Sequence, residues 1–320
     1  MWKTILRRTL LMIPQIIILS ILIFILAEMM PGDALTGMID PNISAEQIAA
    51  QREKLGLNKP LVEKYIDWIW KALQGDFGRS FKHKLPVTEI IGQRIMPTVW
   101  LSLFTTFLLY AIALPLGILA GRYEGTKLDK AVNVYTFISY SIPTFVLALL
   151  FLWFFGYHTG MLPTRGTVDP TLQPGTFAYL LSRIQHMIMP AMTGALLGTT
   201  SVIQYLRSGV IDAKTEDYVR TARAKGVPEK VVYRRHIFRN SVLPIAAFVG
   251  YQITSLISGS IIMERIFVYP GMGQLFYTSI TGRDFPVMVT LTLLFGTMAL
   301  LGTLLSDIIM VFVDPRIRMR

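Results

Sequence analysis

The chain has 320 residues, of which 52% are hydrophobic and only 16% are charged. Soluble domains carry about 25% charged residues, so this composition excludes an ordinary soluble protein and indicates an integral membrane protein. The formal net charge is +11 and cysteine is absent, which excludes disulfide frameworks and thiolate metal sites.

Six apolar runs are each long enough to cross a bilayer, and only the last contains a charged residue, Asp307. The runs are Thr9–Ala27, Thr98–Gly121, Ala131–Thr164, Met187–Leu206, Ser241–Met263 and Phe285–Val313. We therefore predict an all-α integral membrane protein with six transmembrane helices.

Lysine and arginine gather before the first run, in the segments 122–130 and 207–240, and after Val313. Because these residues accumulate on the cytoplasmic side of membrane proteins, we expect both termini to be cytoplasmic. The topology thereby explains the positive net charge, which gives no reason to expect a nucleic-acid partner.

The segment 28–97, after the first run, is expected to be an extracytoplasmic loop with helices of its own. Ser44 and Gln47 have the spacing of a capping box, and a second helix is predicted to begin at Pro60 and to end at Gly75. The stripe of this second helix consists of Leu61, Tyr65, Trp68, Ile69 and Ala72. We expect these helices to form a lid on the outer mouth of the protein or beside it.

Glycine pairs and prolines in the middle runs are typical of helices that pack closely around a cavity. Gly117 and Gly121 are four residues apart, as are Gly194 and Gly198. The prolines are Pro115, Pro143, Pro190 and Pro244. These residues could serve packing alone or a transport pathway. A pathway would have a neutral polar lining, since the runs hold no fixed charge apart from Asp307. Its candidate lining residues are Tyr140, Gln204 and Gln252.

The polar segment 207–240 interrupts the apolar carboxy-terminal half. The stretch 215–225 begins with acids and ends with bases, the charge order that a helix dipole favours. Gly226 is expected to end this helix, and Pro228 to begin the next one. We predict a helix, a glycine corner and a second helix on the cytoplasmic side, projecting side chains toward a soluble partner.

The segment 263–287 is apolar and aromatic, yet it contains Pro270, Gly271 and Gly273 close together. A soluble loop would not carry so many large apolar side chains, so we expect a short helix that dips back into the outer face of the membrane.

Several kinds of catalytic site are excluded by missing motifs. No GxxxxGK[ST] run is present to cradle ATP phosphates, and the four histidines form no metal-binding spacing.

An ion-coupled secondary transporter would carry intramembrane carboxylates, whereas only Asp307 qualifies, and a salt bridge to a neighbouring base or partial solvation explains that residue. An ATP-driven importer and a secondary transporter stay open as classes, and a membrane enzyme fits neither the loops nor the runs.

Four short motifs resemble one family. The RTARAKG run at 220–226 is similar to the cytoplasmic coupling loop of ABC importer permeases, with Arg220 in place of the usual Glu. The segment 52–81, with its LGLxxP and GDxGxS runs, the ERIFxxPGxGxL run that starts at Glu264 and the VDPRIR tail are similar to the peptide and nickel branch. The chain thus resembles a B-type permease subunit of oligopeptide, dipeptide or nickel importers.

The resemblance implies a division into a first helix (1–27), an outer loop (28–97) and a permease core (98–320) with its coupling loop (207–240). It implies a bacterial or archaeal cell membrane and import of oligopeptides or dipeptides, with nickel or another small solute as the alternative. The implied partners are a second homologous permease, two ATP-binding subunits that hold ATP and Mg, and an extracytoplasmic substrate-binding protein. The chain itself would hold no cofactor and have no enzymatic activity of its own.

The resemblance also assigns residues to the coupling of transport with ATP hydrolysis. They are Tyr218, Arg220, Thr221, Ala222, Ala224 and Gly226. Ala222 is expected to tolerate little bulk because it would dock closely into a groove of the ATP-binding subunit.

Overall fold

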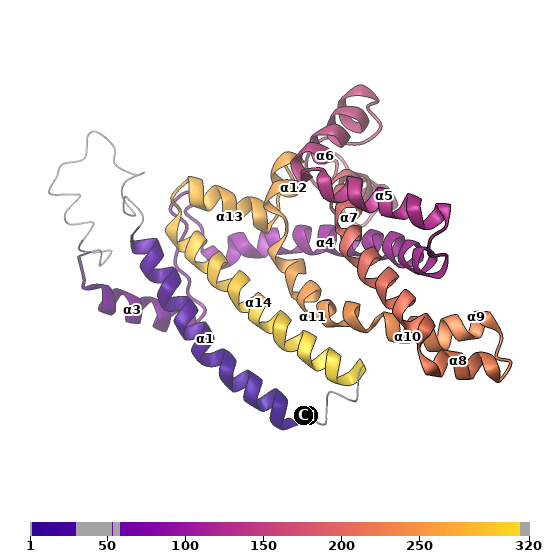
Figure 1. Ribbon diagram of the computed structural model, residues 1–320. Coiled ribbons are helices and arrows are strands. Elements are labelled where there is room, and N and C mark those ends of the chain that lie inside the picture. Colours follow the sequence, from indigo (N-terminus) through magenta and orange to yellow (C-terminus); the bar gives the residue numbers. More distant parts are fainter. Residues whose placement is uncertain (1, 30–52, 54–57, 314–320) are drawn as a thin grey trace.

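The computed structural model describes residues 2–29, 53 and 58–313, and its regular elements are all helices apart from one isolated bridge between Arg79 and Pro86. Within these residues, five helical runs are long and apolar enough to cross a membrane. They are α1 (Trp2–Glu28), α4 (Val87–Arg122), α7 (Phe177–Thr215), α11 (Leu243–Ser258) together with α12 (Ile261–Ile266), and α14 (Phe285–Val313). The predicted all-helical membrane fold is confirmed (Figure 1).

The run Ala131–Thr164, predicted as one transmembrane helix, does not form one continuous helix. The chain forms α5 (Lys127–Ser141), then α6 (Thr144–Phe151), which continues as the π-helix η1 (Leu152–His158), and the two parts meet at 98°. Pro143 causes the break, because proline disfavours helical geometry in the residue before it, and Ile142 is extended with ψ at 120°. A sixth span exists only if this bent pair counts as one.

Two further boundaries differ from the predicted ones. α4 begins at Val87, after Pro86, and so continues across the boundary expected at residue 97. Likewise α7 begins at Phe177 and extends as far as Thr215, well beyond the predicted run. The predicted runs were uncharged, whereas both helices continue past charged residues, such as Arg94 in α4 and Arg183 and Arg207 in α7, so the sequence located the uncharged middle of each helix and missed its ends.

The glycine pairs lie where α4 and α7 pack against each other. A Cβ on Gly121 would come within 2.7 Å of the Val210 Cβ, and one on Gly198 within 2.6 Å of a Leu109 methyl group. Gly117 and Gly194 likewise face the opposite helix, and the order of these contacts shows that α4 and α7 run in the same direction. Close packing of small residues thus holds the central helix pair together, as the spacing indicated.

α14 packs against α11 on one side and against α1 on the other (Figure 1). Asp307 of α14 forms an ion pair with Arg8 of α1, so the salt bridge expected from the sequence is present. This pairing accounts for the single carboxylate in the last apolar run without any role in ion transport.

Short helices lie at the two opposite ends of the bundle (Figure 1). One end, here called the α8 end, carries α8 (Asp217–Ala224), α9 (Glu229–Val231), the π-helix η2 (Val232–Ile237) and α10 (Phe238–Ser241). The other end, here called the α13 end, carries α3 (Leu61–Leu73), α12 and α13 (Met272–Thr281). The start of α1 and the end of α14 both point toward the α8 end.

The predicted outer helices can be compared only in part. The helix expected after Pro60 is present as α3, and Gly75 follows it with φ at +80°. The capping box at Ser44 lies outside the described residues.

Candidate functional site

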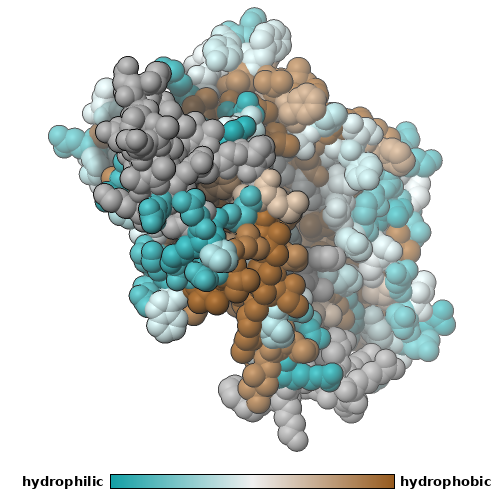
Figure 2. Space-filling model, turned by 90° about the vertical axis from the view of Figure 1, so that its left-hand side faces the viewer, coloured by the Kyte–Doolittle hydropathy of each residue, from teal (hydrophilic) through white to brown (hydrophobic). Residues whose placement is uncertain are grey.

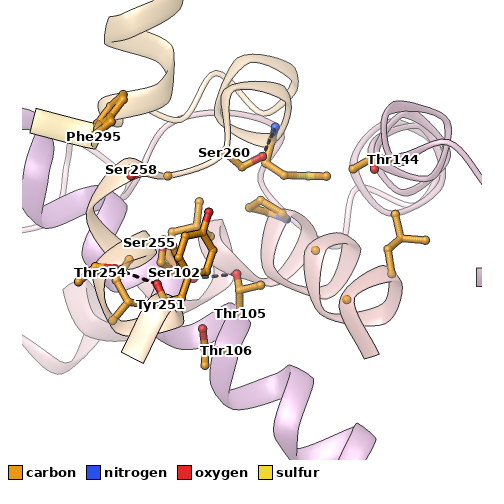
Figure 3. A pocket seen from close by; sticks show the side chains of 18 of the residues that line it. Ser102, Thr105, Thr106, Thr144, Tyr251, Thr254, Ser255, Ser258, Ser260 and Phe295 are labelled. Carbon is orange, nitrogen blue, oxygen red and sulfur yellow. Dashed lines mark hydrogen bonds between the residues drawn. The ribbon is translucent and has the colours of Figure 1, made fainter. Parts of the chain in front are cut away.

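A cavity of about 650 Å³ lies between α4, α7 and α11 and is bordered by the start of α6 and by α14. Its polar lining consists mostly of hydroxyl groups, from Ser102, Thr105, Thr106, Thr144, Tyr251, Thr254, Ser255, Ser258 and Ser260. In Figure 3 the hydroxyls of Ser102, Thr105, Thr106 and Tyr251 gather on one side, and Thr144 stands across from them. The lining residues, all within the described part of the chain, include no charged side chain and no histidine.

The three predicted lining residues do not border this cavity. Tyr140 is 84% exposed on the surface of α5, and Gln204 donates to the Thr136 hydroxyl at 2.8 Å. Gln252 accepts a hydrogen bond from the Tyr110 hydroxyl. A place for them along a pathway stays a prediction, because the structure brings none of them to the cavity. The serines and threonines that line the cavity could have been found from the sequence, because they cluster on α11 and on one stretch of α4.

The segment 259–281, here called the α12–α13 corner, forms one wall of the cavity through Gly259, Ser260 and Met263. The buried carboxylate of Glu264 holds this corner together. Its Oε1 accepts from the Thr98 hydroxyl at 2.9 Å, and its Oε2 accepts from the backbone N–H of Gln274 at 2.8 Å. One side chain therefore connects α4, α12 and α13.

The same carboxylate explains Gly271 of the ERIFVYPGMG run and Gly259, which precedes that run. A Cβ on Gly271 would lie 2.4 Å from the Glu264 carboxyl carbon and 2.4 Å from the Thr98 hydroxyl oxygen. A Cβ on Gly259 would lie 2.2 Å from Glu264 Oε1, and φ at Gly259 is +66°. The sequence predicted short helices here but not the role of Glu264.

The segment 217–241, here called the coupling hairpin, has the predicted form of helix, glycine corner and helix. Gly226 has φ at +72°, and its N–H donates to the Arg223 carbonyl at 2.9 Å. Pro228 precedes α9, and Arg223 pairs with Glu229 at 2.8 Å across the corner. Gly226 thus ends the first helix and Pro228 starts the second, and an ion pair joins the two arms of the coupling hairpin.

The inner face of the coupling hairpin belongs to the main hydrophobic core. Val219, Val232 and Ile237 are fully buried in a cluster with residues of α4 and α7. The Arg122 guanidinium, at the end of α4, lies 4.7 Å from the centre of the Tyr233 ring. Burial raises the pKa of the Tyr233 phenol, so this group stays neutral. The coupling hairpin is therefore fixed to the ends of the long helices.

Five of the six predicted coupling residues are exposed on the coupling hairpin, namely Tyr218, Arg220, Thr221, Ala224 and Gly226. Ala222 is different, because its side chain is buried in the core cluster. The reason given above for its small size is therefore wrong. The chain's own packing, and not a partner's groove, restricts the size of this side chain.

A polar connection between α5 and α7 was not predicted from the sequence, which assigned Arg207 to the loop. Arg207 lies within α7 and binds Asp129 of α5 through two hydrogen bonds, 2.6 Å from Nε and 2.9 Å from a terminal nitrogen. Asn133 also donates to the same carboxylate at 3.0 Å. This network joins the start of α5 to the part of α7 that precedes the coupling hairpin.

A neutral cavity inside the helix bundle and an exposed hairpin fixed to its core define the membrane component of a transporter. The chain belongs to the family described as binding-protein-dependent transport system inner membrane components, whose model matches residues 113–319. The model of the amino-terminal part of the same membrane component matches residues 1–104.

Similar proteins match over almost the whole chain. The oligopeptide transport system permease protein AppB of Bacillus subtilis (strain 168) is 38% identical over 314 residues, which are 98% of each chain. The glutathione transport system permease protein GsiC of Escherichia coli (strain K12) is 33% identical over 318 residues, 99% of each chain.

Two solved transporters share the fold. An inward facing conformation of the MetNI methionine ABC transporter matches with a TM-score of 0.55 at 17% identity, covering 70% of this chain and 96% of that chain. An amino acid ABC transporter crystallised with histidines gives 0.51 at 15% identity, covering 69% and 92%.

The chain is thus a permease subunit of an ABC importer, embedded in the membrane. The expected family is confirmed, and the secondary transporter is set aside as a class. ATP is hydrolysed by separate subunits of such importers, and a substrate-binding protein delivers the solute.

Proposed function

We propose that this chain forms, together with a second homologous permease, the membrane path for oligopeptides or other short peptides. An extracytoplasmic binding protein delivers the peptide, and two ATP-binding subunits, which bind ATP and Mg, drive its import. Two similar permeases bear names that refer to oligopeptides and glutathione, and their matches span nearly the whole chain.

The lining of the cavity is the observation that carries the peptide proposal. A peptide backbone offers N–H and C=O groups, and uncharged hydroxyls can donate to and accept from both. Since the lining has no fixed charge, it neither holds a zwitterion tightly nor selects one side-chain charge. A volume of about 650 Å³ falls within the range of small-molecule sites, about 300–1,000 Å³.

Nickel is the alternative substrate, and the lining argues against it. Nickel ions favour imidazole and other nitrogen or oxygen ligands of defined geometry. No group of three or more His, Cys, Asp or Glu side chains placed to hold a metal ion occurs within the described residues. A path for nickel would have to depend on a carrier that keeps the ion ligated.

The exposed face of the coupling hairpin is the proposed contact with the ATP-binding subunits. Its outer residues Tyr218, Arg220 and Thr221 are exposed, while its inner residues are fixed to α4 and α7. A movement of the partner would therefore reach the long helices that border the cavity. This assignment puts the α8 end, and with it both termini, in the cytoplasm, in agreement with its bases.

Uptake by the complete complex tests the substrate. Membrane vesicles with all subunits should accumulate short peptides of varied sequence only when ATP is supplied. Exchange of the binding protein, with this chain unchanged, should shift which peptides enter. Uptake of nickel without peptide would overturn the proposal.

A pair of substitutions tests the path itself. Thr106→Trp places a large side chain in the cavity and should lower peptide uptake at least tenfold without lowering the amount of complex. Thr303→Trp is the matched control, because Thr303 is exposed on α14 and does not line the cavity. Equal uptake by the two variants would place the path elsewhere.

Cysteine crosslinking tests the contact at the coupling hairpin. Ala224→Cys should crosslink to an ATP-binding subunit, because Ala224 is exposed on α8. Ala222→Cys, on the same helix but buried, should not. Crosslinking to the extracytoplasmic binding protein would reverse the orientation.

A further inference from the structure

α3 has a wider apolar surface than its packing in this chain uses. On one side Trp68 packs against Ile23 and Ala27 of α1 and Met288 of α14, and its ring lies 5.6 Å from that of Phe24. The adjoining arc of α3 holds four more apolar side chains that are each more than half exposed. They are Val62, Ile66, Trp70 and Leu73, exposed by 67%, 56%, 65% and 76%.

The polar residues of α3 occupy the remaining arc of the helix. Lys64 forms an ion pair with Glu28 at the end of α1, with an N–O distance of 2.9 Å. Asp67 pairs with Lys59, which precedes the helix, and Lys71 lies on the same arc. α3 therefore has three faces. One apolar face packs against α1 and α14, a second apolar face is exposed, and the third face is charged.

The height of α3 along α1 is set by its contacts. The Tyr65 hydroxyl meets the Ser20 hydroxyl at 2.8 Å, and the Lys64 ammonium meets Glu28. Ser20 stands about 12 Å from the Glu28 end of α1, since a helix rises about 1.5 Å per residue. Because α1 crosses the membrane between Ile5 and Glu28, α3 lies level with the last turns of a membrane-spanning helix.

The surroundings of α3 on this face are apolar as well. The flank of α1 exposes large hydrophobic side chains, among them Ile17, Ile21, Leu22 and Leu26. In Figure 2, which shows this side of the molecule, hydrophilic side chains and a broad hydrophobic surface lie directly next to each other. Exposure of such an apolar surface to water is unfavourable, whereas contact with lipid at the level of the last turns of α1 is favourable.

We propose that α3 is an interfacial helix, which lies in the boundary between headgroups and acyl chains of the leaflet at the α13 end. Val62, Ile66 and Leu73 contact lipid acyl chains, and Trp70 occupies the interface, where tryptophan is enriched. Lys59, Asp67 and Lys71 face the headgroups and water. Of the two positions expected from the sequence, α3 thus takes the one beside the mouth, and it contributes no residue to the cavity.

Spin labels on single cysteines test this placement. The chain has no cysteine of its own, so Ile66→Cys and Asp67→Cys each give one labelling site in this subunit. In the complete transporter, reconstituted in liposomes, the label at 66 should collide more often with oxygen, which concentrates in lipid, than with a water-soluble nickel chelate. The label at 67, one residue away, should show the opposite preference.

Each alternative occupant has its own result. Higher access of the chelate at both positions would show a helix exposed to water, and low access of both reagents at 66 would show a face covered by protein. Either result would overturn the proposal.

A second measurement avoids the cysteine variants. Brominated lipids should quench part of the tryptophan fluorescence, and Trp70→Phe should lower the quenched part, to which the exposed Trp100 and Trp153 also contribute. Trp68→Phe is the matched control and should leave it, because Trp68 packs against α1 and α14. Unchanged quenching in the Trp70→Phe transporter would contradict the placement.

Discussion

The coupling hairpin and the α12–α13 corner are both short-helix elements with a glycine turn, at opposite ends of the bundle, and their polar groups are satisfied in opposite ways. In the α12–α13 corner, the buried carboxylate of Glu264 binds groups of α4 and α13. In the coupling hairpin, charged side chains such as Arg220 and Arg223 are exposed. The polar groups of the α12–α13 corner are satisfied within the chain, whereas the outer face of the coupling hairpin is exposed and is the proposed contact with the ATP-binding subunits.

This difference shows which changes each element tolerates. A buried hydrogen-bonded carboxylate leaves no room for an added atom and no water to replace a lost partner. Substitutions in the α12–α13 corner should therefore lower the stability of the chain itself. Substitutions on the exposed face of the coupling hairpin should leave the chain folded and impair its interaction with other subunits.

The largest effect on stability is expected for Gly271→Ala. The new Cβ would lie 2.4 Å from both the Glu264 carboxyl carbon and the Thr98 hydroxyl oxygen, so the three elements joined there must move apart. Overpacking of this kind costs about 1–3 kcal/mol. The amount of complex that survives heating in detergent should fall clearly.

Gly92→Ala is the matched control. Gly92 lies within α4, and nothing stands within 4 Å of its added Cβ. Because glycine destabilises a helix by about 0.5–1 kcal/mol relative to alanine, this variant should be as stable as the natural chain or more so. If both variants lost the same stability, the account of the α12–α13 corner would be wrong.

A smaller loss of stability with a large loss of function is expected for Gly226→Val. Gly226 has φ at +72° but open space around it, so the cost is backbone strain alone, about 1–2 kcal/mol for a residue with a Cβ. The protein should still insert into the membrane, and ATP-driven uptake should be lost because the corner of the coupling hairpin is altered.

Gly226→Asn tests whether the loss of uptake comes from backbone strain at the corner or from the mere presence of a side chain there. Asparagine tolerates positive φ better than valine, so uptake should be largely kept. Normal uptake by the valine variant, measured at equal amounts of complex, would contradict a coupling role for this corner.

The sequence predicted the coupling hairpin well because its signals are local. Gly226 ends one helix and Pro228 starts the next, whatever the rest of the chain does. The α12–α13 corner was predicted only as short helices, since Glu264 and Thr98 are 166 residues apart and their pairing has no local signature. Pro143 could also be recognised in the sequence as a site where the helix is disturbed. No local rule, however, says whether a proline bends a helix by a few degrees or breaks it.

Two expectations about individual residues show the limit of a local pattern. Ala222 was expected at a partner's groove, yet the inward side of α8 is set by packing against distant α4 and α7. Gln204 and Gln252 were expected along a pathway, which stays a prediction, and in the structure both have hydrogen-bond partners within the chain and lie outside the cavity lining. Periodicity gives a helix its faces but does not tell which face meets its own chain and which meets another.

The smallest effect is expected for Arg223→Ala, and it tests the exposed side of the comparison. Arg223 and Glu229 join the two arms of the coupling hairpin at 2.8 Å, with 40% and 53% of their side chains exposed. Exposed ion pairs contribute about 0.2–1 kcal/mol and weaken as salt is added, because water and ions screen the charges. Gly226 and the buried face of the coupling hairpin should hold its shape without the pair. Arg223→Ala should therefore change the heat resistance of the complex only slightly, and the difference should shrink further at high salt.

Arg220→Ala is the control, since its contact with Asp217 is longer, at 3.6 Å, and more exposed. A loss for Arg223→Ala as large as that for Gly271→Ala would mean that the coupling hairpin depends on its charges for folding, and the contrast between the two ends would fail.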